Sequence, residues 1–335
     1  MRRPSAKPAW SWRSRALRGF AWQILAVLVI GTALWFLAHN TLENMRARGI
    51  QSGFGFLTQP AGFDIGESLI PYDALDPYWK AFVVGVLNTL RVALIGIVLA
   101  TIWGALLGIG RLSRNAIVRG LCYAYVEVFR NIPILLQLLL WYLVFTDILP
   151  PVSEPISVGG LFFLSKGGFS FPVPVWGLGE ALAWSIPAPG TFSMEGGASA
   201  TPEFLGVLMG LVLYTSAFIA EVVRAGIQSV AHGQLEAAAS LGLSRAQTIR
   251  KVILPQALRV IIPPMTSQYL NLTKNSSLAV AIGYPDVVSI ATTSLNNTGR
   301  AVECIAIIML VYLTTSLSTA AQMNWYNRRA AIRER

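Results

Sequence analysis

The chain has 335 residues, of which 54% are hydrophobic and only 13% are charged, about half the charged share of a typical soluble domain. This composition argues against a disordered chain, a collagen and a disulfide scaffold, and it indicates an integral membrane protein. The 26 Lys and Arg residues outnumber the 16 Asp and Glu residues, which gives a net charge of +10. Such an excess fits either nucleic-acid binding or the basic cytoplasmic segments of a membrane protein, so the positions of the charges must decide.

The chain offers few residues for metal or disulfide chemistry. Cys122 and Cys304 lie in apolar stretches, and His39 and His232 have no partners at metal-ligand spacing. We therefore expect no metal site and no disulfide, and both cysteines as small buried side chains.

Several apolar stretches are long enough to cross a bilayer, because a spanning helix needs about 20 mostly apolar residues. In chain order they cover residues 21–38, 81–110, 120–146, 204–223, 260–283 and 302–323. A basic segment precedes the first stretch, as in a signal peptide, but the apolar run is longer than a signal core and no Ala-x-Ala site follows it. The sequence thus predicts an all-α integral membrane protein with about six transmembrane helices, the first of them uncleaved.

Lysine and arginine are distributed unevenly between the segments that connect these stretches. Counted from a cytoplasmic N-terminus, 18 lie in cytoplasmic segments, five lie on the opposite side and three lie inside spans. This asymmetry predicts that both termini are cytoplasmic. It also accounts for the basic charge without nucleic acid, because no Lys/Arg run is interleaved with aromatic residues.

The spans divide the chain into a simple predicted order. A basic cytoplasmic N-terminus (1–20), the first transmembrane helix (21–38) and an external loop (39–80) precede a membrane-spanning core domain (81–325) and a basic cytoplasmic tail (326–335). The core contains an external insert at 148–203 and a cytoplasmic loop at 226–258. Within the insert, residues 159–186 are partly apolar but are broken by Lys166, Pro172, Pro174 and Glu180, which favours a loop with short interfacial pieces over a seventh span.

The cytoplasmic loop carries the most informative pattern. Residues 235–240 favour a helix, and Gly242 stands where a left-handed cap would end it. Ser244 is then expected as the N-cap of a second helix, with Gln247 at the capping-box position, and Pro255 is expected to break or bend that helix. Two short helices joined at a glycine would fit a groove on a partner; an ordinary basic loop is the alternative.

At these residues the chain resembles a known family. Glu236-Ala237-Ala238, then Gly242, then Val252-x-Leu254-Pro255 resembles the E-A-A loop of ABC importer permeases, with Val in place of the usual Ile. Segments 88–90, 128–133, 220–227 and 272–278 resemble the polar amino-acid (histidine/glutamine-type) branch, and 283–286 the general L-amino-acid permeases. The resemblance covers about residues 78–325. The chain departs from the family at Ala231 or His232, where many members have one proline, and in a shorter external insert.

The resemblance implies a type I importer permease in a bacterial cytoplasmic (inner) membrane that translocates polar or general L-amino acids. No Walker G-x-x-x-x-G-K-[ST] motif occurs, so a separate dimeric ATPase subunit would use ATP, and this chain would bind no cofactor and would not be an enzyme. Implied partners are that ATPase, a second permease subunit (homodimer or heterodimer), an external amino-acid-binding protein and membrane lipid, but no nucleic acid. The ATPase-coupling residues would be Glu236, Ala237, Ala238, Gly242, Leu254 and Pro255.

Polar residues inside spans are costly and usually face a cavity or a partner. In the fifth span, Ser267, Asn271 and Asn275 are spaced at i, i+4 and i+8 beside Lys274, so one helix face is polar. That face could line the passage, with Lys274 attracting a carboxylate, or could supply polar contacts between helices. Candidate substrate-pathway residues are Arg130, Gln268, Asn271, Lys274, Asn275, Ser276 and Ser277.

Other charges and glycines in the spans have structural interpretations. Arg130 could pair with Glu127, or with Pro133 could mark an opened helix at a substrate site. Glu221 and Arg224 are expected as an internal ion pair or gate. The pairs Gly104/Gly108 and Gly206/Gly210 would permit close helix approach.

Two other functions compete with this interpretation. A membrane-embedded enzyme lacks support because the sequence shows no Ser/His/Asp set, no metal cluster and no H-E-x-x-H motif. An ion-coupled carrier or channel acting without an ATPase would not need a groove-fitting cytoplasmic element.

Overall fold

The computed structural model describes residues 15–47, 49, 52–175, 183–190 and 193–330. Most of the predicted basic N-terminus, and half of the predicted basic tail, lie outside these residues. The chain divides into two units, Met1–Phe54 and Gly55–Arg335. In the first unit, α1 (Arg15–Ala47) is a helix of 33 residues, longer at both ends than the apolar run at 21–38. Most apolar side chains between residues 18 and 47 are exposed, although Met45 is buried.

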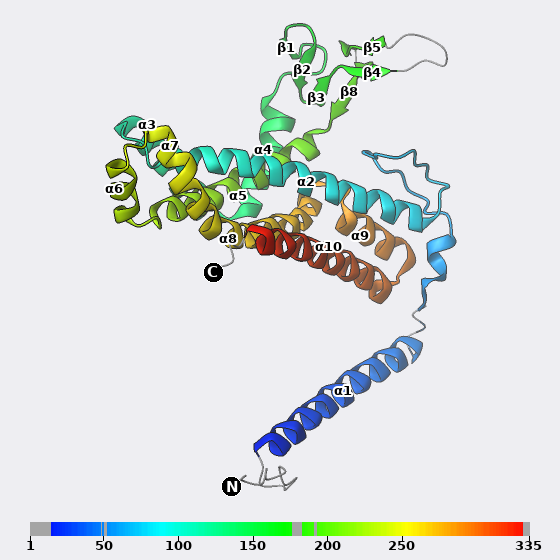
Figure 1. Ribbon diagram of the computed structural model, residues 1–335. Helices are drawn as coiled ribbons and strands as arrows, with labels where there is room; N and C mark the ends of the chain where they lie inside the picture. Colours follow the sequence, from blue (N-terminus) through cyan, green and yellow to red (C-terminus); the bar gives the residue numbers. More distant parts are fainter. Residues whose placement is uncertain (1–14, 48, 50–51, 176–182, 191–192, 331–335) are drawn as a thin grey trace, which may run out of the picture. The chain divides into compact units, whose positions relative to one another are not determined.

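Four helices in the described part of the chain are long and apolar enough to cross a membrane. They are α1, α2 (Tyr78–Gly110), α5 (Pro202–Gln228) and α10 (Ala301–Ala330). Two bent helix pairs also qualify if each pair counts as one span, which brings the number to the predicted six. Figure 1 shows that the second unit is mainly helical, in agreement with the predicted fold class.

The third predicted span is bent, not straight. α3 (Ala116–Asn131) and α4 (Ile134–Leu143), which continues as the π-helical η2 (Val144–Ile148), meet at an angle of 105°. Pro133 explains the break, because a residue before proline avoids the helical region and Ile132 is extended at φ −93°, ψ 128°. The buried Gln137 amide donates to the carbonyls of Phe129 and Ile132, both at 2.9 Å, and so holds the broken end.

The fifth predicted span also differs from a single helix. α8 (Leu254–Asn275) contains Pro263 and Pro264 in its interior and passes into the 3-10 helix η4 (Ser276–Ile282), which ends at the left-handed Gly283. A further helix, α9 (Val287–Thr298), follows and has no counterpart among the predicted elements. It starts where the Asp286 carboxylate caps it by accepting a hydrogen bond of 2.8 Å from the Ser289 N–H.

The core of the second unit surrounds α5, which packs against α2, α3, α4 and α8. Glycines allow the closest approaches, as predicted. A Cβ atom added at Gly104 would lie 2.7 Å from Ile219 Cβ, one at Gly108 would lie 2.7 Å from the Ala220 carbonyl oxygen, and one at Gly210 would lie 2.6 Å from Leu138 Cδ2. Close backbone packing of this kind stabilises helices where water provides no driving force.

We expect Gly108→Val to destabilise the protein by about 1–3 kcal/mol or more, because the added side chain must push α2 away from α5. The measurement is the thermal unfolding midpoint of the purified protein in detergent. Gly120→Val is the control, since a Cβ at Gly120 on α3 meets nothing within 4 Å. Equal midpoints for the two variants would contradict the packing described here.

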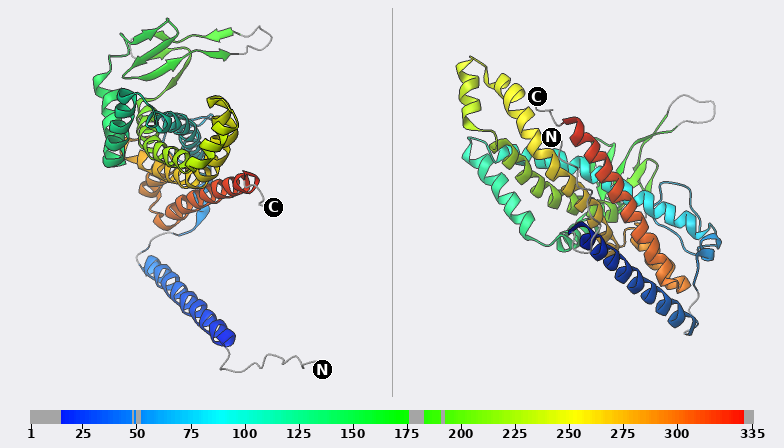
Figure 2. Two further views of the ribbon diagram at one scale, coloured as in Figure 1. Left: turned by 60° about the vertical axis from the view of Figure 1, so that its left-hand side comes forward. Right: turned by 60° about the horizontal axis from the view of Figure 1, so that its bottom comes forward.

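The external insert contains short antiparallel strands where only a loop was predicted. β1 (Ile156–Val158), β2 (Phe162–Ser165), β3 (Gly168–Phe171) and β8 (Ala198–Ala200) form one sheet in the order β1-β2-β3-β8. β4 (Val173–Val175) pairs with β5 (Ala183–Ser185), and β6 (Ala188–Pro189) pairs with β7 (Met194–Glu195). Figures 1 and 2 show the strands grouped beyond the end of α4. Each strand has only two to four residues, too few for an alternating pattern to identify it.

The segment 55–77 before α2 folds onto the helices and is not an open loop. Phe56, in the 3-10 helix η1 (Phe54–Thr58), is fully buried with its ring edge-on to Tyr78 and Phe82. The Ala61 N–H donates to the Asp76 carbonyl at 2.9 Å, which closes the segment into a loop. We call residues 55–77 the external segment.

Candidate functional site

The predicted pair of short helices joined at a glycine is present. α6 (His232–Ser240) ends at Gly242, which has φ +70°. The Leu243 N–H donates to the Ala238 carbonyl (3.1 Å), and the Gly242 N–H donates to the Ala239 carbonyl (2.9 Å). This pair of bonds is a Schellman motif, which satisfies the last carbonyls of α6.

The start of the second piece also agrees with the prediction. Ser244 caps α7 (Arg245–Thr248), and both hydrogen bonds of the capping box with Gln247 are present. We call residues 232–253, which include α6 and α7, the coupling element. Figures 1 and 2 show α6 and α7 side by side at one end of the helices.

Of the two predicted effects of Pro255, the break of the second helix does not occur. α7 continues through the π-helical η3 (Ile249–Ile253) directly into α8, and Pro255 occupies the first turn of α8. The wide π turn accommodates a ring that would otherwise clash with the carbonyl one turn earlier. The helical path therefore runs without interruption from Ser244 to Asn275 and joins the coupling element to the fifth span.

The coupling residues suggested by the family resemblance divide into two sets. Ala238 is buried and supports the turn, whereas Glu236, Ala237, Gly242, Leu254 and Pro255 are exposed. Glu236 Oε1 lies 3.0 Å from His232 Nδ1, one turn earlier on α6, and both side chains are mostly exposed. An exposed pair of this kind contributes little to stability, so the Glu236 carboxylate stays accessible to a partner.

The predicted polar face of α8 is accessible in the second unit. Ser267, Asn271 and Lys274 are exposed, and Gln268 and Asn275 are half-buried. Among the described residues, no ion pair includes Lys274. Because exposed polar groups on a membrane-spanning helix are costly in lipid, this face requires water or a polar partner.

The serines at the end of this face are hydrogen-bonded to the helix backbone. Ser276 is buried and donates to the Thr273 carbonyl at 2.7 Å, and the half-buried Ser277 donates to the Lys274 carbonyl at 2.7 Å. These bonds help the chain change from α8 to the 3-10 helix η4.

Arg130 lies in a different cluster, at the ends of α2, α3 and α5. The Glu221 carboxylate accepts hydrogen bonds from Arg111 and Arg224, which confirms the predicted Glu221–Arg224 pair and adds a third residue. Arg130 Nη1 lies 4.0 Å from Glu221 Oε2, and its guanidinium lies 5.2 Å from the centre of the Phe218 ring.

The alternative in which Arg130 pairs with Glu127 is wrong. Asn131 donates to the Glu127 carbonyl at 2.7 Å, while Arg130 extends toward α5. Arg130 is the second-last residue of α3, which ends at the Pro133 break, so it lies beside an opened helix. Among the described residues, no hydrogen bond or ion pair joins it to the α8 face.

The segments at 88–90 and 283–286 contact each other, which the sequence did not show. The Asn88 amide donates to the Pro285 carbonyl (2.9 Å) and to the Glu67 carbonyl (2.8 Å), and Thr89 Oγ1 accepts the Val287 N–H (3.1 Å). A buried asparagine in an apolar span was the available signal, because such a side chain needs partners.

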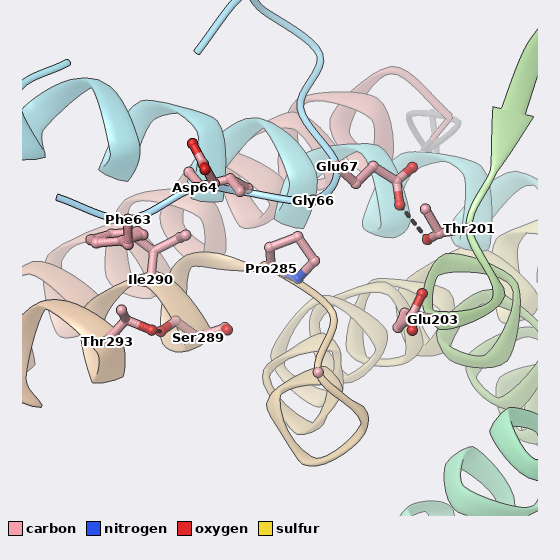
Figure 3. Close-up of a pocket in the computed structure, with 12 residues that line it drawn as sticks. Phe63, Asp64, Gly66, Glu67, Thr201, Glu203, Pro285, Ser289, Ile290 and Thr293 are labelled. Atoms are coloured by element: carbon pink, nitrogen blue, oxygen red, sulfur yellow. Dashed lines mark hydrogen bonds between the residues drawn. The ribbon is translucent and has the colours of Figure 1, made fainter. Parts of the chain in front are cut away.

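A cavity of about 380 Å³ lies where the external segment, the start of α5 and α9 meet. Figure 3 shows its lining from these three elements, with the Glu67 carboxylate bonded to Thr201. Thr201 caps the first turn of α5, whereas α6 begins a few residues after α5 ends at Gln228. The cavity and the coupling element therefore lie at opposite ends of a helix about 40 Å long.

This arrangement defines a class of protein. A bundle of membrane-crossing helices with an accessible polar face is joined directly to a shaped element at one end. Among the described residues, no group of His, Cys, Asp and Glu could hold a metal ion. Membrane-crossing helices with an accessible polar face are the arrangement expected of a transport permease.

The chain belongs to the family described as the binding-protein-dependent transport system inner membrane component, whose model matches residues 96–332. It is therefore a multi-pass permease subunit of an ABC importer in the inner membrane, and ATP is hydrolysed by a separate subunit. Family membership implies an ATPase and a substrate-binding protein as partners.

Two relatives cover almost the whole chain. A putative amino-acid ABC transporter permease of Escherichia coli (strain K12), YhdX, is 43% identical over 390 residues and covers 100% of this chain and 99% of its own length. The general L-amino acid transport system permease AapQ of Rhizobium johnstonii is 40% identical over 385 residues, with 97% and 96% covered. Both alignments are longer than this chain, so these relatives contain segments that it lacks.

Solved structures support the fold. The crystal structure of an amino acid ABC transporter with histidines has a TM-score of 0.56 and 25% identity, covering 75% of this chain and 95% of that chain. The inward-facing MetNI methionine ABC transporter has a TM-score of 0.53 at 18% identity, which supports the fold alone.

Proposed function

We propose that this chain translocates polar or general L-amino acids, driven by an ATPase that acts on the coupling element. The observation that carries the proposal is the uninterrupted helical path from Ser244 to Asn275, which links the coupling element to the polar face of α8. Relatives named as general and putative amino-acid permeases support the substrate class. Both termini are cytoplasmic in this proposal, in line with the distribution of Lys and Arg.

The coupling element converts closure of the ATPase into movement of the helices. Gly242 permits the turn between α6 and α7, and exposed Glu236, Ala237, Leu254 and Pro255 face the ATPase, while Ala238 holds the turn from within. Because η3 and α8 continue α7, displacement of the turn tilts the polar face of α8 as a rigid body. This chain binds no cofactor, and ATP is bound only by the partner.

A second permease subunit completes the passage. The exposed polar side chains of α8 do not suit lipid, and one bundle does not enclose them. A second permease, either another copy or a related chain, would cover this face and form the passage between the two subunits, with lipid on the remaining apolar surface. An external binding protein would deliver the amino acid at the end of α5 that lies away from the coupling element.

Residues on the α8 face and at the α3–α4 break would contact the substrate. Lys274 and Arg130 supply positive charge for a carboxylate, and Gln268, Asn271, Asn275 and Ser277 supply polar groups. Buried Ser276 would position this face through its bond to the backbone. Asn275 is neutral, so this position supplies no carboxylate that would attract a cationic side chain.

The proposal is tested by uptake into proteoliposomes that contain the permease, its co-purified ATPase and its binding protein. We expect a subset of labelled L-amino acids to accumulate. This accumulation should require ATP on the side of the membrane where the ATPase lies. Uptake that continues without ATP and stops when the proton gradient is dissipated would favour the ion-coupled carrier instead.

We expect Lys274→Gln to raise the KM for uptake roughly tenfold or more, because a hydrogen bond to a charged group contributes about 1.5–3 kcal/mol. Lys274→Arg should retain more activity, since it keeps the charge. Lys166→Gln, an exposed lysine of the insert, is the control and should leave KM unchanged. A Lys274→Gln variant with wild-type KM would remove Lys274 from the substrate pathway.

A further inference from the structure

The tip of the coupling element presents one large apolar side chain outward. Leu241 is 80% exposed and lies between α6 and Gly242. The Schellman motif that holds this turn commonly has an apolar contact between the residue after the left-handed glycine and the third-last helical residue. Here those residues are the half-buried Leu243 and the buried Ala238. Leu241 therefore takes no part in the internal packing of the turn.

Leu241 protrudes beyond the side chains that surround it. Ala239, Gly242 and Ala246 are exposed and small, so no neighbouring side chain of similar size shields it. The hydrogen bonds of the motif fix its backbone before any partner binds, which lowers the entropy lost on binding. A fixed, protruding leucine is suited to a matching pocket.

The charges beside it indicate the chemistry of that pocket. Arg245, Arg250 and Lys251 are exposed on α7 and η3, and basic groups at an interface rim favour an acidic partner surface. A membrane surface fits less well, since an interfacial helix needs a wide apolar face. The remaining exposed residues of α6 are small or polar, and Ile249 on η3 is 47% exposed, compared with 80% for Leu241.

We infer that Leu241 is the apolar anchor of the coupling element and inserts into an apolar pocket, bordered by carboxylates, on the ATPase subunit. This inference rests on the proposed function, which supplies the ATPase as the partner at this end of the helices. It goes further by naming the side chain that carries the affinity and the surface that receives it. Burial of a leucine corresponds to about tenfold to a hundredfold in affinity.

The first test compares two leucines of the same turn. The permease assembly is purified and its ATPase subunit is removed. The affinity of the permease assembly for the purified ATPase is then measured for wild type and for each variant. Leu241→Ala should weaken binding about tenfold or more without lowering the thermal midpoint, and Leu241→Met should restore most of it. Leu243→Ala should lower the midpoint instead. Equal affinity of wild type and Leu241→Ala would overturn the inference.

A second test does not depend on the stability of these variants. In a chain with Cys122 and Cys304 replaced by alanine, Leu241→Cys is labelled with a water-soluble maleimide in nanodiscs of anionic phospholipid. We expect rapid labelling without the ATPase and protection with it. Three outcomes would overturn the inference: labelling unchanged by the ATPase, protection by the nanodisc alone, or a disulfide to a second permease copy.

The same preparation separates this inference from the proposed function. If wild-type ATP-dependent uptake is intact while the introduced thiol of the Leu241→Cys variant stays reactive in the full complex, only the anchor is wrong. If no ATPase binds the wild-type assembly and uptake does not need ATP, the proposed function itself is wrong.

Discussion

Gly242→Val is expected to abolish most ATP-dependent uptake while the protein still inserts and folds. Gly242 has φ +70°, a left-handed conformation that costs a residue with a Cβ roughly 1–2 kcal/mol and a β-branched residue more. The turn must open to relieve this strain, so α6 would lose its angle to α7. We expect uptake to fall at least about tenfold while ATP hydrolysis by the complex continues, because coupling is lost and the ATPase site is untouched.

Gly233, on the helix α6 that precedes this turn, provides a matched control. A Cβ at either glycine meets nothing within 4 Å, and only Gly242 has a positive φ. Gly233→Val should therefore keep near-normal uptake, and Gly242→Asn should retain more activity than the valine, since asparagine tolerates the left-handed region. Wild-type coupling in Gly242→Val, measured as amino acid transported per ATP hydrolysed, would refute the role of the turn.

Glu67→Gln is expected to cause the largest loss of stability among single charge changes in the external segment. Glu67 is only 9% exposed, its carboxylate bonds to Arg91 on α2, and it accepts a hydrogen bond of 2.5 Å from Thr201 at the start of α5. Arg91 also lies 4.1 Å from the centre of the Phe204 ring. Removing one partner of a buried pair leaves a charge uncompensated and costs on the order of 3 kcal/mol.

The thermal midpoint of the purified protein measures this effect, and Asp64→Asn is the control. Asp64 lies in the same segment and lines the same cavity but is exposed, so its change should be small. The double variant Glu67→Gln/Arg91→Met should recover much of the loss, because it removes the second charge too. A midpoint for Glu67→Gln equal to that of Asp64→Asn would show that the pair does not hold the external segment.

Local features of the coupling element could be predicted because their partners are close in sequence. The capping box joins Ser244 to Gln247, and the Schellman bonds join residues no more than five apart. Residue type and spacing are enough for such bonds. The predicted break at Pro255 does not occur, since the effect of a proline depends on the helix geometry before it, and here a π turn accommodates the ring.

The candidate substrate-pathway residues were only partly predictable, because their surroundings come from residues far away in the sequence. The polar spacing of α8 showed a face, but whether that face is accessible depends on α5 and α10, which pack beside it. Arg130 was expected beside Glu127 or at an opened helix. The sequence identified neither the 105° angle of the bend at Pro133 nor Glu221 on α5 as the partner of Arg130.

The sequence by itself determined the membrane class, the apolar spans and the turn at Gly242, because each depends on composition or on residues within a few positions. Only the tertiary structure decided the Arg111–Glu221 pair, the bonds from Asn88 to Glu67 and Pro285, and the continuity of the coupling element with α8. Asn88 and Pro285 are 197 positions apart. Contacts at such separation depend on how whole helices pack, and many packings satisfy the same local pattern.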